Sequence, residues 1–200
     1  MKCPLRVLAL LALFSVSASA DTIYNNFGPS QTFQTNAGYN IENDLDGFAG
    51  LAVPFTPQAN YADSTFTLPM LTLFSGDFTV GLFSDASGLP GTALDTSSFA
   101  SANNFTQGMF TGSMGPLTSG TTYWLLVLPD SDGMLLSWNF NSTGDNGAFA
   151  FTSNGTTWNS FSGIRPAFEV DGTPVPEPGT LVLLATGLLG VAARFRKKRL

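Results

Sequence analysis

Histidine is absent from the 200-residue sequence, and the single cysteine, Cys3, lies close to the N-terminus. Without histidine, the chain cannot form a Ser-His-Asp triad or the usual histidine-containing zinc and iron sites. Lysine and cysteine are both missing between residues 21 and 193, which excludes Schiff-base and thiol catalysis there. The sequence therefore predicts no catalytic residue, no metal site and no cofactor, and we expect a protein that is not an enzyme.

Positive charge is nearly absent from the middle of the chain. All fourteen Asp and Glu residues except Glu177 lie between Asp21 and Asp171, whereas Arg165 is the only Lys or Arg between residues 21 and 193. Such an acidic surface repels nucleic acid and anionic lipid, so no nucleic-acid partner is expected. Arg165 is expected to form a bidentate pair with a carboxylate on a neighbouring strand.

The N-terminus has the pattern of a secretory signal peptide. A basic start is followed by an apolar stretch, residues 7–16, and by the small residues Ala18 and Ala20 at a cleavage pattern. We expect residues 1–20 to direct export through the Sec translocon. Signal peptidase would then cut after Ala20, so that the mature chain begins at Asp21.

The last 25 residues contain three segments in a fixed order. Pro176, Glu177 and Pro178 form a stiff extended segment, because proline fixes its own φ and favours an extended residue before it. Residues 180–193 are uncharged and would form a helix of roughly 20 Å, shorter than the ~30 Å hydrocarbon core of a membrane. A basic tail follows, made of Arg194, Arg196, Lys197, Lys198 and Arg199. It is expected to stay cytoplasmic and to leave the rest of the chain outside.

This order of motif, short apolar helix and basic tail, at residues 173–200, resembles the PEP-CTERM sorting signal of exported proteins of Gram-negative bacteria. The resemblance implies processing by an exosortase, a membrane cysteine protease. It also implies a transient inner-membrane intermediate and final residence at the surface, or in the extracellular matrix, of a cell that makes exopolysaccharide. The alternative is an ordinary C-terminal membrane anchor that is not cut.

Residues 21–172 are predicted to form one all-β domain, because short apolar runs alternate with turn residues and no useful amphipathic helix occurs. Strands are expected over Gly47–Phe55 and on either side of Pro69. A central strand is expected over Thr121–Leu128, which is apolar on both faces. This pattern predicts a single antiparallel, jelly-roll-like β-sandwich, followed by a linker from Gly172 to Pro178.

A second pattern is spread over residues 48–170. It consists of turns and strand segments at residues 50–52, 78–85, 88–91, 117–125 and 166–170. These segments resemble the choice-of-anchor β-sandwich domains, whose members carry different C-terminal anchoring signals. The resemblance implies a β-sandwich and a surface location, and it implies no activity.

Two groups of carboxylates could bind a ligand. Asp44 and Asp46 could act as a pair, as in a glycosidase, although the sequence around them is more typical of a turn. Asp130, Asp132 and Asp145 could contribute oxygen ligands to Ca²⁺, but the other ligands of a calcium loop are missing. Turn formation is therefore the favoured interpretation for both groups.

The tryptophans separate two functional hypotheses. Trp124 and Trp138 fall within apolar strands and are expected in the core, whereas Trp158 lies in a polar loop and is expected to be exposed. The first hypothesis is a non-catalytic surface or matrix protein associated with exopolysaccharide. The second is a carbohydrate-binding module with Trp158 as a ligand contact. Burial of all three tryptophans would favour the first hypothesis.

Overall fold

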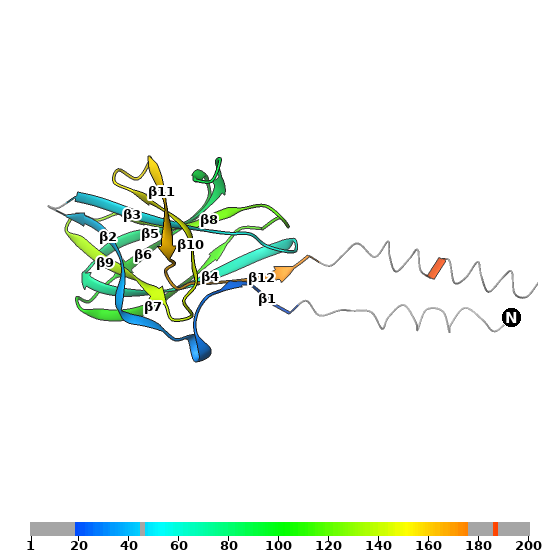
Figure 1. Ribbon diagram of the computed structural model, residues 1–200, viewed down its shortest axis with the longest axis horizontal. Coiled ribbons are helices and arrows are strands. Elements are labelled where there is room, and N and C mark those ends of the chain that lie inside the picture. The colour runs from blue at the N-terminus through cyan, green and yellow to red at the C-terminus, as the bar shows by residue number, and fades with distance from the viewer. Residues whose placement is uncertain (1–18, 45–46, 176–185, 188–200) are drawn as a thin grey trace, which may run out of the picture.

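The strands form one antiparallel sheet that curls on itself (Figure 1). The computed structural model describes residues 19–44, 47–175 and 186–187. Its elements are β1 (Asp21–Asn25), η1 (Pro29–Gln31), β2 (Phe33–Asp44), β3 (Gly47–Phe55), β4 (Tyr61–Phe74), β5 (Gly76–Asp85), β6 (Pro90–Ser101), β7 (Thr106–Met114), β8 (Tyr123–Pro129), β9 (Met134–Asn141), β10 (Asn146–Thr152), β11 (Trp158–Ile164) and β12 (Glu169–Pro174). The prediction of an all-β antiparallel fold is confirmed.

The β2–β3 pair joins two halves of the sheet. One half contains β1, β2, β4, β7, β9 and β12, and the other contains β3, β5, β6, β8, β10 and β11. Ring contacts join the halves, with centroids 5.8 Å apart for Phe66 and Phe99 and 4.9 Å apart for Phe78 and Phe110. The two halves thus enclose a shared apolar core but belong to one continuous sheet.

Strand β8 is buried on both faces, as its sequence predicts. Leu125 and Val127 belong to the core between the two halves. Trp124 and Leu126 point to the opposite face, where they pack in a smaller cluster with Trp158. Because a strand with apolar side chains on both faces needs cover on both, β8 takes a central place between β3 and β5.

Pro69 lies inside one continuous strand, β4, instead of dividing two strands. On one side of β4, pairing with β12 ends at Thr67 and pairing with β9 starts at Met70. Pro69 therefore falls at the gap between two partner strands. On that side of β4 the ladder is already interrupted at Pro69, whereas on the other side β7 pairs continuously, with Met109 opposite Pro69. A proline is best tolerated in a sheet where the ladder is interrupted.

The two predicted membrane-directed segments lie largely outside the described residues. This applies to residues 1–18 of the signal peptide and to residues 180–193 of the apolar helix, of which only 186 and 187 are described. Within the described part of the chain, no helix has the length and apolar character needed to cross a membrane.

Replacing Trp124 by alanine is expected to lower the free energy of unfolding by about 3–5 kcal/mol, since the indole is only 2% exposed and its removal leaves a cavity. The indole also donates a hydrogen bond from Nε1 to Asp85 Oδ1 over 2.8 Å. Phe105, which is 73% exposed, provides the control, and Phe105→Ala should cost far less. Denaturant unfolding measures both variants, and equal losses would contradict the assignment of Trp124 to a packed core.

Candidate functional site

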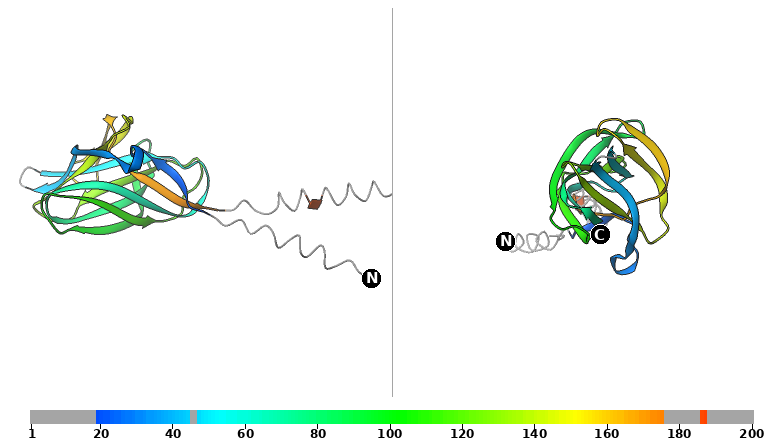
Figure 2. Two further views of the ribbon diagram at one scale, coloured as in Figure 1. Left: turned by 90° about the horizontal axis from the view of Figure 1, so that it is seen from below. Right: turned by 90° about the vertical axis from the view of Figure 1, so that its left-hand side faces the viewer.

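The first and last strands of the domain pair with each other, and this brings the two predicted processing regions together. In the β1–β12 ladder, Asp21 lies opposite Gly172 and Asn25 lies opposite Glu169. The start of β1 and the end of β12 therefore lie at the same end of the domain, as Figures 1 and 2 show. Ala20, after which signal peptidase is predicted to cut, is exposed at this end.

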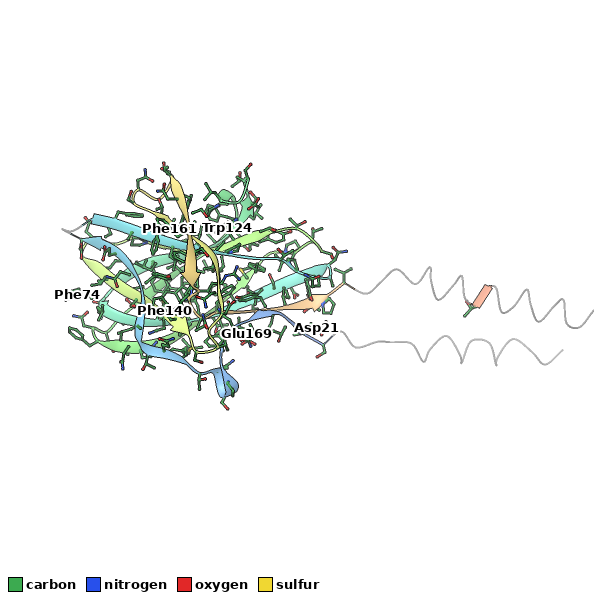
Figure 3. The ribbon with its side chains drawn as sticks, in the orientation of Figure 1. Asp21, Phe74, Trp124, Phe140, Phe161 and Glu169 are labelled. Carbon is green, nitrogen blue, oxygen red and sulfur yellow. The ribbon has the colours of Figure 1, made fainter. Side chains whose placement is uncertain are left out.

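Figure 3 shows which residues lie at the two ends of the domain. Asp21 lies at the end from which the chain enters β1, whereas Phe74 lies at the opposite end. Phe74 is 47% exposed and contacts Phe105, with ring centroids 6.2 Å apart. The end of the domain where β1 starts and β12 ends, which adjoins the two predicted processing regions, is therefore opposite the end that carries Phe74 and Phe105.

Strand β12 continues further toward the sorting motif than the sequence predicts. Residues 172–174 belong to β12, which pairs with β4 as far as Pro174 opposite Tyr61. One residue later, the Val175 N–H donates a hydrogen bond to the Asn60 carbonyl oxygen over 2.8 Å. The predicted linker from Gly172 to Pro178 is therefore wrong for its first residues. Pro174 can end the strand because a terminal strand residue does not need to donate to the ladder.

Side-chain hydrogen bonds fix β1 to a distant turn. The Tyr24 hydroxyl donates to Asp145 Oδ2 over 2.6 Å, and the Asn26 Nδ2 amide donates to the same oxygen over 3.1 Å. Asn26 also donates to the Pro166 carbonyl oxygen over 2.9 Å and accepts from the Phe168 N–H over 2.8 Å. These contacts attach the start of the domain to the segment that leads into β12.

Arg165 completes this network, but not in the predicted way. Its Nη1 donates to the Tyr24 hydroxyl over 3.3 Å, and within the described residues no ion pair joins it to a carboxylate. Its Nε is buried without a hydrogen-bond partner among the described residues. The guanidinium lies against the backbone of Gly147, where an added Cβ would come within 2.5 Å of Nε. The predicted bidentate pair is wrong, because the nearby carboxylate, Asp145, accepts from Tyr24 and Asn26 instead.

Burial and hydrogen bonding shift the pKa values of two groups on these strands. Burial, with the hydrogen bond to Asp145 as a second cause, raises the pKa of Tyr24 to about 12, and Arg165 opposes the shift. Burial also raises the pKa of Glu169, helped by the nearby charge of Asp171. Glu169 accepts a hydrogen bond of 2.7 Å from Asn25 and one of 3.1 Å from Gln31, so it holds the end of β1 against β12.

The predicted exposure of Trp158 is wrong. The side chain is 8% exposed and packs with Trp124 and Ala150, because β11 pairs with β10 and turns the indole toward the second apolar cluster. Trp124 and Trp138 are 2% and 0% exposed, as predicted. Trp158 therefore offers no open ring face for stacking on a sugar.

The carboxylates considered as Ca²⁺ ligands have separate partners. Asp130 accepts from the Thr79 hydroxyl over 2.7 Å, and Asp132 accepts from the Asn43 amide over 3.0 Å. Asp145 belongs to the Tyr24 network. Among the described residues, no group of three or more potential metal ligands is gathered, and Asp46 of the proposed carboxylate pair lies outside them.

The residues that follow β12 match a known sorting signal. A family model described as the PEP-CTERM protein-sorting motif matches residues 174–197. The match supports the predicted PEP-CTERM signal, and it suggests an exported protein that is processed by exosortase and then located at the surface. It begins at Pro174, the last residue of β12, so the matched region and the folded domain adjoin directly.

A comparison with curated proteins found no match for the chain. The resemblance of residues 48–170 to the choice-of-anchor domains remains a prediction. Glu177, its flanking prolines and the basic tail, all within or beside the matched region, lie outside the described residues.

Gly172→Ala is expected to lower the free energy of unfolding by about 1–3 kcal/mol by overpacking the paired termini. An added Cβ would lie 2.8 Å from Ile23 Cδ1, 2.8 Å from Tyr61 Cδ1 and 2.9 Å from the Asp63 carbonyl oxygen. The backbone oxygen cannot move without disturbing β4. Gly115→Ala is the control, since its Cβ would meet only Asp95 Oδ2 at 3.8 Å. Denaturant melts should separate the two variants, and indistinguishable melts would contradict this packing.

Tyr24 is expected to deprotonate near pH 12 in an alkaline titration followed by tyrosinate absorbance, above the ordinary tyrosine value of 10.0. Because the folded-state pKa of about 12 lies above the ordinary value of 10.0, folding favours the protonated phenol. This contribution to stability is complete below pH 10.0 and is lost as the pH rises toward 12. Tyr24→Phe should remove the transition near pH 12 and flatten the alkaline loss of stability. An unchanged titration curve in this variant would rule out the assignment.

Proposed function

We propose that the chain is an exported, non-catalytic β protein that exosortase processes and that resides at the cell surface or in an exopolysaccharide matrix. The observation that carries the proposal is the PEP-CTERM match at residues 174–197. In this proposal, the signal peptide of residues 1–20 directs export, and the apolar helix of residues 180–193 holds the chain in the inner membrane until the cut.

The arrangement of the termini supports this proposal. Because β1 and β12 pair, a chain held by its C-terminal helix has both domain ends on the membrane side. The opposite end, with Phe74 and Phe105, then points away from the membrane. A domain displayed in this way can be released by one cut beyond β12, which leaves all of its strands in the released part.

The acidic composition also supports a role outside the cell. The described part of the chain contains one cation, Arg165, which is engaged with Tyr24. The remaining charged surface is carboxylate, which keeps a protein soluble and repels anionic lipid. The alternative of carbohydrate binding through Trp158 loses its proposed contact, since that indole is 8% exposed.

The processing proposal is tested by two variants of the tail in a host that contains exosortase. Glu177→Ala, or removal of residues 194–199, should leave uncleaved protein in the inner membrane, because the first variant alters the motif and the second removes the basic stop. Cell fractionation and intact-mass measurement give the readout.

Asp95→Ala provides the control, since it removes a carboxylate that accepts only from the neighbouring Thr96 N–H among the described residues. This variant should be processed like the unmodified chain. If both tail variants reach the surface with the normal mature mass, the sorting signal is not the one proposed.

A further inference from the structure

The folded domain ends directly at the sorting motif. Pro174 pairs with Tyr61, and the Thr173 N–H donates to Asp63 Oδ1 over 3.2 Å. The Val175 N–H donates to the Asn60 carbonyl oxygen over 2.8 Å. Since the motif begins at residue 176, no free spacer separates it from the last backbone hydrogen bond of the domain.

Asn60 is itself held in place from a third segment. Its side-chain Oδ1 accepts from the Ser119 N–H over 2.9 Å, and the Ser119 hydroxyl donates to the Gln58 carbonyl oxygen over 2.8 Å. Next to it, Tyr61 exchanges backbone hydrogen bonds of 2.8 Å and 3.1 Å with Leu117. The acceptor for Val175 is therefore part of a fixed edge, which we call the exit edge: Asn60, Tyr61, Pro174 and Val175.

A protease binds its substrate as an extended segment on both sides of the bond that is cut. Residues that are still hydrogen-bonded in a sheet cannot enter that cleft until they leave the sheet, which requires local opening. A cut within residues 176–178 needs the residues just upstream in the cleft, and these include Val175 and Pro174. The exit edge and the processing enzyme therefore compete for the same two residues.

We propose that the exit edge fixes where and how fast the sorting signal is cut: the cut falls C-terminal to Pro176, and its rate depends on release of Val175 from Asn60. This inference rests on the proposed processing by exosortase. It makes Asn60 and Val175 positioning residues for that reaction, with no direct part in the chemistry. The mature domain keeps β12 complete.

The test compares three full-length chains in a host that contains exosortase. The first is unmodified. The second carries Gly-Ser-Gly-Val inserted after Val175, which keeps both the Val175 hydrogen bond and a valine before Pro176. The third carries the same insertion between residues 45 and 46, in the β2–β3 connection, as a matched control. Pulse–chase labelling measures the rate of processing, and intact mass gives the new C-terminus.

The insertion after Val175 should speed processing about two- to tenfold, the range expected when one backbone hydrogen bond no longer has to open. The control should match the unmodified chain, and the mature C-terminus should lie beyond Val175. Equal rates in all three chains, or a mature chain that ends at or before Val175, would overturn the inference while leaving exosortase processing intact. Absence of processing in every chain would overturn the proposed function and this inference with it.

Hydrogen exchange gives a second readout that needs no exosortase. On the full-length chain in detergent, the Val175 amide should exchange more slowly than in an unstructured peptide, both with and without the insertion. Exchange at the rate of a free peptide would overturn the inference, because the hydrogen bond to Asn60 would not restrict the chain.

Discussion

Packing between the two halves of the curled sheet is the interaction on which the rest of the structure depends. The domain contains no cysteine, so no disulfide can restrict its unfolded state, and stability has to come from burial. Aromatic rings supply much of this burial, as in the contacts of Phe78 with Phe99 and Phe110. The second apolar cluster, around Trp124, adds burial on the outer face of β8. This core allows the surface to be strongly acidic, because stability does not rely on surface ion pairs.

The sequence predicts those elements whose own residues carry a strong pattern. The predicted strand Gly47–Phe55 coincides with β3, and the two-sided burial of β8 follows from its continuous apolar run. The strands β6 and β7 could not be predicted in the same way, because Ser, Thr, Gly and Ala dominate them and their burial alternates only weakly. The burial of Trp158 could not be predicted from its local sequence either, since its indole packs against Ala52 and Trp124, which are remote in sequence.

In the candidate site, too, the sequence predicts the features made of contiguous residues and misses those made by residues far apart in the chain. The sorting signal can be recognised from the sequence because its prolines, apolar run and basic tail are contiguous. The exit edge cannot, because the contact between Asn60 and Val175 joins residues far apart in the chain, and neither residue carries a local signal. The Tyr24 network is hidden for the same reason: Tyr24, Asp145 and Arg165 meet only after the sheet has curled. The sequence singles out Arg165 as the one cation between residues 21 and 193. Its charge predicts a carboxylate partner, and not the Tyr24 hydroxyl that it contacts in the structure.

In the proposed export route, the pairing of the termini imposes an order on folding. Within the described residues, β1 pairs with β12 and with no other strand, so the first strand exported has no partner until the last one has emerged. Contacts of such high sequence separation form late, because loop closure precedes the gain from pairing. The sorting segment follows β12 without a spacer, so in the proposed route it is exported directly after the last strand of the domain. Closure of the β1–β12 ladder and arrival of the sorting signal thus coincide, so the domain that meets the processing enzyme is one that can already be folded.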